Sequence, residues 1–368
     1  MKPNRITNVN IFTDTLLLSP EEVVQHPRLH TSEVHLQRIY SYRKAVQNIL
    51  DGQDGRLFVV LGPCSIHDFD IALDYARRLK GLAERVQETL FLIMRVYFEK
   101  PRTVVGWKGF INDPFMDDSF QLQEGILRSR ELLLHITDMD LPAATEALDP
   151  IMPQLFGDLI TWTAMGARTT ESQTQREMAS GLSTPVGFKN GTDGSVEIAL
   201  NAIRSSASSH RFLGINTDGR CSVFHTRGNP YGHLVLRGGK TPNYDADSVR
   251  AYSEKLRTHG LPLNIVVDCS NGNSQKDHRR QPAVFANCID QVVAGNTSIA
   301  GLMLESHIQE GKQDIPADLN DLRYGVSVTD ACIDWETTEE AILSAHAKLL
   351  PLIQSRAVAR SLVMPALA

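Results

Sequence analysis

The sequence predicts an α/β fold, a closed (β/α)8 TIM barrel with an N-terminal extension and an inserted β-hairpin. Three observations favour it: short apolar runs alternate with helical patterns from residue 57 onward, eight of these runs can serve as barrel strands, and no Pro/Ser/Gly-rich linker divides the 368 residues. Such alternation is typical of a parallel sheet whose strands are joined by helices. The length would also suit two domains of ordinary size, but a barrel of about 250 residues or more accounts for it as one.

The hydrophobic pattern divides the beginning of the chain into two parts. Residues 1–30 have no clear period and are expected to form an arm, whereas residues 32–51 carry a helical stripe of apolar side chains that stops at Gly52. At the other end, residues 355–368 are small and apolar without a period, so we expect little regular structure there. The predicted divisions are 1–52 for the arm and helix, 53–350 for the barrel and 351–368 for the C-terminal tail.

The barrel strands are predicted from short apolar runs that are bounded by turn residues or by helical patterns. Two further runs between the sixth and seventh strands, Ser222–His225 and Leu234–Leu236, are interpreted as the inserted antiparallel hairpin. The eight predicted strands are Leu57–Leu61, Phe91–Tyr97, Pro142–Ala147, Ala164–Ala167, Val186–Phe188, Phe212–Ile215, Asn264–Val267 and Gly301–Leu304.

Composition argues against several classes of protein. The net charge of −6 leaves no chain-wide basic surface for nucleic acid, so any cationic site has to be local. Five cysteines without a CxxC spacing argue against a disulfide framework and a zinc ribbon. Residues 1–10 have no apolar signal region, and no run of about 18 apolar residues predicts a membrane span. We therefore expect a cytoplasmic protein that binds neither nucleic acid nor membranes.

Basic side chains gather where the predicted strands end, which is where a barrel of this kind carries its chemistry. Convergent charges of one sign repel each other unless an anion lies among them, so this rim is expected to bind a substrate with phosphate and carboxylate groups. The alternative is that each one is a solvated residue of the barrel rim. The six cations are Arg95, Lys100, Arg102, Arg168, Lys189 and Arg237.

A second group at the strand ends combines one thiol, Cys64, with two carboxylates, Glu305 and Asp330. These three ligands could bind a divalent transition metal. A single cysteine is, however, often a small core residue, and carboxylates at strand ends often cap the next helix. From spacing alone both interpretations remain open.

Six longer strings are similar to those of one enzyme family. They are Gly62–Asp68, Arg95–Thr103 with Gly106–Gly109, Gly166–Gln173, Pro185–Gly194, Leu236–Lys240 and Val328–Cys332. From about residue 15 to about residue 350, the sequence resembles the type I 3-deoxy-D-arabino-heptulosonate 7-phosphate (DAHP) synthases. The resemblance implies a metal-dependent barrel enzyme that condenses phosphoenolpyruvate (PEP) with erythrose 4-phosphate, the first step towards the aromatic amino acids.

The resemblance also implies roles for individual residues. Lys100, Cys64 and Asp330 would be catalytic, and Arg102 and Thr103 would hold the phosphate of the aldose. A divalent metal ion (Mn, Fe, Co or Zn) would lie at Cys64, Asn271, Glu305 and Asp330. PEP would bind Arg95, Lys100, Glu146, Ala167, Arg168, Lys189 and Arg237.

Members of the family are commonly feedback-inhibited by an aromatic amino acid, at a site built partly from the arm of a neighbouring subunit. Gly214 stands where the Phe-sensitive members tend to have serine and the Tyr-sensitive members glycine, and the extra room suits a phenolic hydroxyl, so the resemblance implies tyrosine as the preferred effector. The apolar side chains of the arm would pack on a neighbouring barrel, which predicts a homodimer or homotetramer. The residues implied for the effector site are Pro153, Gln154, Ser183, Phe212, Gly214 and Val223.

Two positions depart from the family pattern. Asn271 stands where the family has a metal-binding histidine, and Gln175 stands where it has a histidine beside the PEP phosphate. An amide oxygen is a weaker ligand than imidazole for these metals, so we expect a weakly held metal ion, and an amide cannot relay a proton by titrating. Two alternatives to DAHP synthesis therefore stay open: a PEP-dependent synthase that acts on another aldehyde, and a low-activity or regulatory paralogue.

Overall fold

The computed structural model describes residues 18–101 and 106–363. Eight strands close into a barrel in which neighbouring strands are parallel, in the order β1-β10-β9-β8-β5-β4-β3-β2. This confirms the predicted (β/α)8 barrel. The strands are β1 (Leu57–Gly62), β2 (Leu90–Arg95), β3 (Ala143–Glu146), β4 (Trp162–Met165), β5 (Val186–Lys189), β8 (Gly232–Leu236), β9 (Ile265–Asp268) and β10 (Ile299–Glu305).

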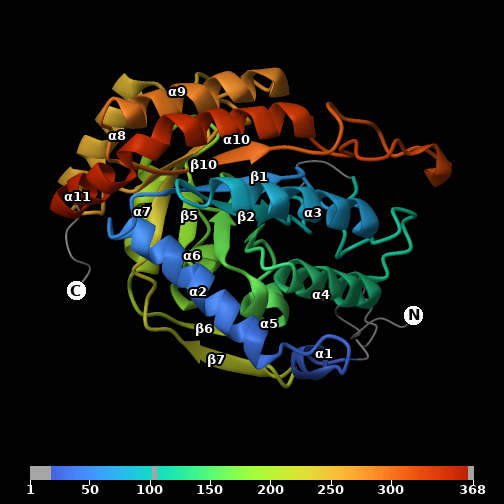
Figure 1. Ribbon diagram of the computed structural model, residues 1–368. Helices are drawn as coiled ribbons and strands as arrows, with labels where there is room; N and C mark the ends of the chain where they lie inside the picture. The colour runs from blue at the N-terminus through green and yellow to red at the C-terminus, as the bar shows by residue number, and fades with distance from the viewer. Residues whose placement is uncertain (1–17, 102–105, 364–368) are drawn as a thin grey trace.

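Helices surround the barrel and join its strands (Figure 1). Their positions follow from amphipathic patterns and capping residues. In α3, for example, Asp68 accepts a hydrogen bond from the backbone of Ile71 at the start, and the buried side chains recur every three or four residues. The helices are α1 (Pro20–Gln25), α2 (Glu33–Leu50), α3 (Phe69–Val86), α4 (Leu122–Asp138), α5 (Met152–Phe156), α6 (Gln173–Gly181), α7 (Glu197–Ser206), α8 (Ala246–Thr258), α9 (Gln281–Val293), α10 (Trp335–Leu349) and α11 (Ile353–Val363).

The interior of the barrel is packed with apolar side chains and closed at one end by α2. Val46, Ile49 and Leu50 of this helix belong to the same buried cluster as the inward-facing residues of the strands. The backbone carbonyl of Leu50 accepts a hydrogen bond from Asn264, the residue before β9, so α2 covers the end at which the strands begin. The helix α2 does not cover the opposite end of the barrel, where the strands finish and where the candidate active site lies.

The sixth barrel strand is β8, which corrects the prediction from the sequence. Phe212–Ile215 belongs instead to β6 (Arg211–Ile215), which pairs in antiparallel fashion with β7 (Cys221–His225) outside the barrel. The physical reason is burial: β8 is buried at every position, as a strand covered on both faces must be, whereas β6 and β7 are partly exposed along their length. The inserted hairpin exists, but its strands are β6 and β7.

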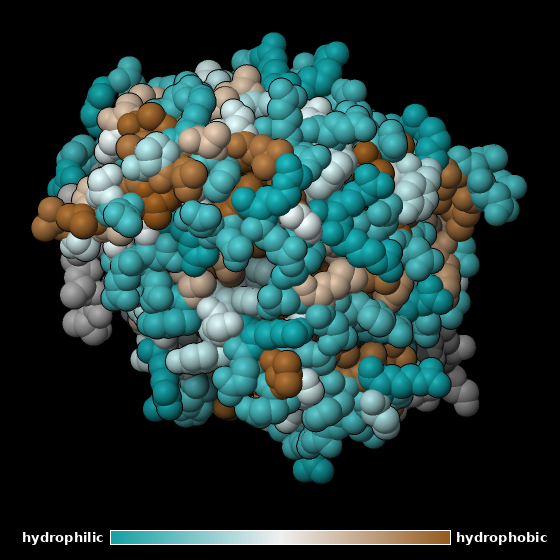
Figure 2. Space-filling view, in the orientation of Figure 1, coloured by the Kyte–Doolittle hydropathy of each residue, from teal (hydrophilic) through white to brown (hydrophobic). Residues whose placement is uncertain are grey.

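The C-terminal tail also differs from the prediction. Residues 353–363 form α11, and two of its arginines are buried. Arg356 donates to the carbonyls of Gly55 and Ile299, and Arg360 donates to the carbonyl of Ile49, so the helix is hydrogen-bonded to the closed end of the barrel. Val358 and Leu362 on its other side are exposed, as is Leu350 just before the helix, and Figure 2 shows apolar surface over this segment.

The arm predicted for residues 1–30 falls partly outside the described residues, since 1–17 are not described. The described part contains α1 and leads into α2. A completely buried arginine on α4, Arg130, donates hydrogen bonds to the carbonyl of Leu29 and to the hydroxyl of Thr31, and forms an ion pair with Asp158. Among the helices that the structure describes, none combines the length and apolar character needed to cross a membrane.

Candidate active site

A polar cleft of about 220 Å³ lies where the barrel strands end. Each described residue that the sequence predicted to bind PEP lines this cleft. Arg102 and Thr103, predicted for the aldose phosphate, lie outside the described residues. The predicted PEP-binding residues that line the cleft are Arg95, Lys100, Glu146, Ala167, Arg168, Lys189 and Arg237.

Two of the cations in the cleft are held by buried carboxylates. Arg95, the last residue of β2, donates to Glu305 at 3.0 Å and to the carbonyl of Pro63 at 3.0 Å. Its guanidinium carbon lies 3.5 Å from the centre of the Tyr97 ring, a cation–π contact. Lys189 donates to Asp268 at 2.8 Å. These contacts fix both cations within the fold itself.

The ionisation of the buried pair follows from these contacts. Burial disfavours the charged form of Asp268, but the ammonium of Lys189 and a hydrogen bond from Ser270 hold the pKa of this carboxyl well below its usual range. Asp268 therefore stays ionised at neutral pH. The sequence assigned no role to Asp268, although its place directly after a predicted strand was a signal that could have drawn attention to it.

Three other cations lack such partners. Within the described part of the chain, Lys100, Arg168 and Arg237 form no ion pair with a carboxylate, and all three line the cleft. Lys100 donates instead to the sulfur and to the carbonyl oxygen of Cys64, each at 3.1 Å. Burial works against its charge, yet Cys64 and Glu305 raise the pKa of Lys100, so it stays protonated. Uncompensated positive charge of this kind favours an anionic ligand.

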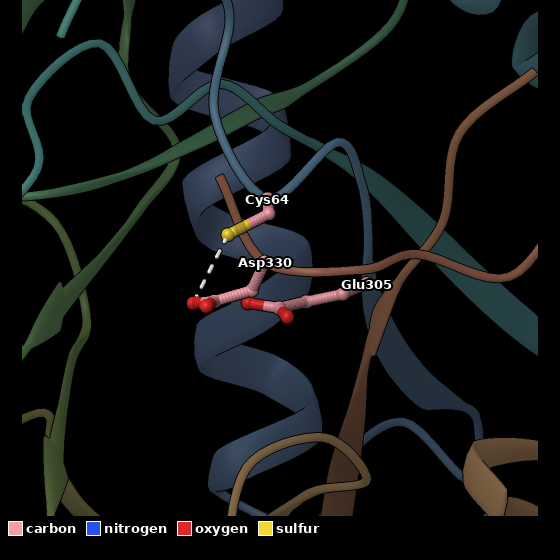
Figure 3. A group of neighbouring side chains, drawn as sticks. All are labelled: Cys64, Glu305 and Asp330. Carbon is pink, nitrogen blue, oxygen red and sulfur yellow. Dashed lines mark hydrogen bonds between the residues drawn. The ribbon is translucent and has the colours of Figure 1, made fainter. Parts of the chain in front are cut away.

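Cys64, Glu305 and Asp330 converge at the edge of this cleft (Figure 3). Cys64 follows β1, Glu305 ends β10, and Asp330 lies in the loop before α10. Their ligand atoms all lie within 4.8 Å of one another, and the Cys64 thiol donates to Asp330 at 3.6 Å. Burial raises the pKa of both Cys64 and Glu305, and it outweighs the opposing effect of the nearby Lys100 and Arg95. One thiolate and two carboxylates fit a divalent transition metal.

Asn271 lies in the same cleft, in the loop after β9. Its side-chain oxygen accepts a hydrogen bond from Arg237 at 3.0 Å. Its side-chain nitrogen donates to Asp268 at 3.1 Å and to the hydroxyl of Ser270 at 2.8 Å. Both ends of the amide are therefore engaged by neighbouring polar groups.

Gln175, the other departure from the family pattern, does not line the cleft. It lies in the first turn of α6, is buried, and donates a hydrogen bond of 2.6 Å to the carbonyl oxygen of Leu148. Its own side-chain oxygen is buried and has no partner in the described structure. The side chain therefore joins α6 to the loop after β3, one layer behind the cleft.

A larger groove of about 660 Å³ separates the β6–β7 hairpin from α5 and α6. It brings together five of the six residues implied for an effector site: Pro153, Gln154, Ser183, Phe212 and Gly214. Val223 does not line it, although its cross-strand partner Leu213 does; both of these side chains are largely exposed. A third cavity of about 310 Å³ shares Pro153, Gln154 and Ser183 with the groove and Glu146 with the cleft.

The chain was compared with known proteins. The model of the DAHP synthetase I family matches residues 32–342. A phospho-2-dehydro-3-deoxyheptonate aldolase of Escherichia coli (strain K12), described as Tyr-sensitive, is 52% identical over 349 residues, which cover 95% of this chain and 98% of the relative. A Trp-sensitive aldolase of the same organism is 50% identical over 300 residues, which cover 82% of this chain and 86% of that relative.

The fold is also similar to a solved structure of an aldolase with the same name. The phospho-2-dehydro-3-deoxyheptonate aldolase from Francisella tularensis SCHU S4 superposes on this fold with a TM-score of 0.89 and 43% sequence identity, and the match covers 94% of this chain and 99% of that chain. Since the family model matches most of the chain, and since relatives about half identical to it align along nearly its whole length, the chain belongs to the DAHP synthetase I family.

Proposed function

We propose that the cleft at the strand ends is where this DAHP synthase condenses PEP with erythrose 4-phosphate, forming DAHP and inorganic phosphate. One observation carries the proposal: Lys100, Arg168 and Arg237, three cations without a carboxylate partner among the described residues, lie beside a cluster of metal-binding character. Both substrates are anionic, so their approach requires positive charge that the fold has not already neutralised. Relatives named for this reaction match almost the whole chain, and the alternatives of another aldehyde or a regulatory role are not favoured.

The side chains divide the work between binding and proton transfer. Arg168, Arg237 and Lys189 bind the phosphate and carboxylate groups of PEP, while Arg95 is held in place by Glu305. The methylene carbon of PEP forms a bond with the aldehyde carbon, water adds to the PEP carbon that bears the phosphate oxygen, and phosphate leaves. Lys100 is protonated and donates the proton that the new alkoxide requires.

For the remaining groups the proposal rests on the donor chemistry and on the family resemblance. Cys64, Glu305 and Asp330 would hold a divalent metal ion. When bound, such an ion supplies Lewis acidity that polarises a carbonyl oxygen. Arg102 and Thr103 are proposed to bind the aldose phosphate.

We also propose that the groove beside the hairpin binds tyrosine. Its aromatic wall consists of Phe212 and Phe224, whose rings stack with centroids 5.7 Å apart. A Cβ atom at Gly214 would come within 2.4 Å of the Phe224 ring, so the glycine is needed for that ring to occupy its present position. The two Escherichia coli relatives carry different effector names. The preference for tyrosine therefore rests on the family resemblance at Gly214, because the space beside this residue is taken up by the Phe224 ring.

A homodimer or homotetramer is proposed from the outer face of the hairpin. Leu213 is 74% exposed and its cross-strand partner Val223 is 58% exposed, which leaves an apolar pair open to solvent. Such a pair is better accounted for when another subunit covers it. A cytoplasmic location stays a prediction.

The activity is tested by following PEP loss and phosphate release by the purified protein with Mn²⁺. Erythrose 4-phosphate should be consumed faster than a five-carbon aldose phosphate. Lys100→Gln should lower kcat by about 100-fold or more, because general acid catalysis contributes on this scale. The control is Lys255→Gln, since Lys255 is exposed on α8 and pairs with Glu197. Equal rates for Lys100→Gln and the control would contradict the role of Lys100.

A further inference from the structure

We infer that Asn271 is a positioning residue that orients Arg237 for PEP, and that it is not a ligand of the metal ion. The inference rests on the proposed function, because it assigns Arg237 to PEP and the metal ion to Cys64, Glu305 and Asp330. It differs from the metal-ligand role that the family resemblance implied for Asn271. The observation behind it is that the amide of Asn271 already joins Arg237, which lines the cleft, to the buried carboxylate of Asp268.

The orientation of the amide is determined by its neighbours. The oxygen accepts from the guanidinium of Arg237, and the nitrogen donates to the carboxylate of Asp268. If the amide were reversed, its N–H groups would face the donors of Arg237 and its oxygen would face the carboxylate of Asp268. Both contacts would then be repulsive, because a guanidinium has no acceptor and a carboxylate has no donor when ionised. Asp268 is ionised, as its lowered pKa requires.

This amide completes a chain of polar contacts across three strands. Lys189 ends β5 and contacts Asp268, which ends β9; Asp268 contacts Asn271; and Asn271 contacts Arg237, which follows β8. The two outer members of the chain are cations that we assign to PEP. Asn271 therefore fixes the position of the Arg237 side chain relative to Lys189. Arg237 has no carboxylate partner of its own among the described residues.

The backbone conformation of residue 271 also suits asparagine. Asn271 has a φ of 57°, in the left-handed region, where asparagine is better tolerated than most residues because its short polar side chain hydrogen-bonds locally. Glycine tolerates the same backbone. Replacement by glycine thus removes the amide without imposing backbone strain.

The inference also sets the number of protein ligands for the metal ion. If the oxygen of Asn271 remains with Arg237, then Cys64, Glu305 and Asp330 supply the protein ligands, and the other coordination positions are open to water or substrate. Metal affinity should then be nearly independent of Asn271, while PEP affinity should depend on it even when no metal is present. A ligand role predicts the opposite pattern.

The experiment measures two affinities for the full-length protein. PEP binding is measured by calorimetry in excess EDTA, and Mn²⁺ binding by electron paramagnetic resonance without PEP. Asn271→Gly should weaken PEP binding about tenfold, the scale of a hydrogen bond to a charged group, and should change the Mn²⁺ dissociation constant less than threefold. Asp330→Ala is the matched comparison: it should weaken Mn²⁺ binding by about 10-fold or more and leave PEP binding in EDTA within about threefold.

Asn271→Ala is measured in parallel, because it removes the amide but keeps the Cβ atom. A loss of PEP affinity in both variants is due to the amide, and not to added backbone freedom. Loss of Mn²⁺ affinity beyond threefold in both variants would overturn the inference, as would unchanged PEP affinity in either folded variant. The proposed function fails differently, since the unaltered protein would then bind no PEP at all.

Discussion

Replacing Arg130 with methionine should show how strongly the segment before α2 is held to the barrel. The guanidinium of Arg130 is fully buried and donates to both oxygens of Asp158, to the carbonyls of Leu29 and Leu155, and to the hydroxyl of Thr31. Removing one partner of a buried ion pair typically costs about 3–5 kcal/mol. The Asp158 side chain is 25% exposed and keeps some hydration, so we expect a loss of about 3 kcal/mol at pH 7.

The same variant should show a characteristic pH dependence. Burial tends to raise the pKa of Asp158, but hydrogen bonding and charge from Arg130 hold it below the usual value. In the unaltered protein this contribution to stability is present above the unfolded pKa of about 3.9 and is lost as pH falls through the lower folded pKa. Without Arg130, burial dominates and Asp158 takes up a proton at higher pH. The gap in stability between the two proteins should therefore narrow from pH 7 to pH 4.

Urea unfolding followed by circular dichroism at both pH values measures this gap. Arg128→Met is the control, because Arg128 lies on the same helix but is partly exposed and pairs with Glu124 in the preceding turn. It should cost less than about 1 kcal/mol. A loss below about 1 kcal/mol for Arg130→Met at pH 7, or a gap that does not change with pH, would refute the reasoning.

Three other outcomes are expected. PEP should raise the melting temperature by about 2 °C at ten times its dissociation constant, and a thermal-shift titration without any response, with or without Mn²⁺, would argue against the PEP site. Burial and the neighbouring Asp149 raise the pKa of Glu99 to about 7, so the free energy of unfolding should fall as pH rises from 4.5 to 7. Glu99→Gln should remove that fall. Urea unfolding at several pH values would contradict this if the variant and the unaltered protein lost stability equally with rising pH. Deleting residues 1–25 should lower the oligomeric order measured by light scattering and abolish tyrosine inhibition. An unchanged oligomeric order with full inhibition would exclude the arm from both roles.

Much of the barrel follows from local sequence, because a strand buried on both faces is a short apolar run and a crossover helix is an amphipathic one. The ends of those runs also identify most of the cleft. Arg95, Lys189 and Glu305 stand at the last position of their strands, and parallel strands of one barrel end at the same rim. The sequence alone thus predicts that these residues, far apart in the chain, converge at one rim of the barrel.

The tertiary structure alone decided which run became the sixth strand. Phe212–Ile215 and Leu234–Leu236 are both short and apolar, and local propensity does not separate them. Only pairing on both sides, with β5 and with β9, distinguishes β8, and the partners lie far away in sequence. Burial of two arginines in α11 was hidden for the same reason, since their acceptors are carbonyls of other elements.

The contacts of Asn271 show the same limit at the level of one side chain. Its residue type suits both a metal ligand and a hydrogen-bond bridge, and the sequence by itself favours neither. The distances to Arg237 and Asp268 distinguish the two, because an amide has one acceptor end and one donor end and each must face its complement. Sequence determined which chemical groups reach the rim of the barrel; the packing of three strands determined which of them touch.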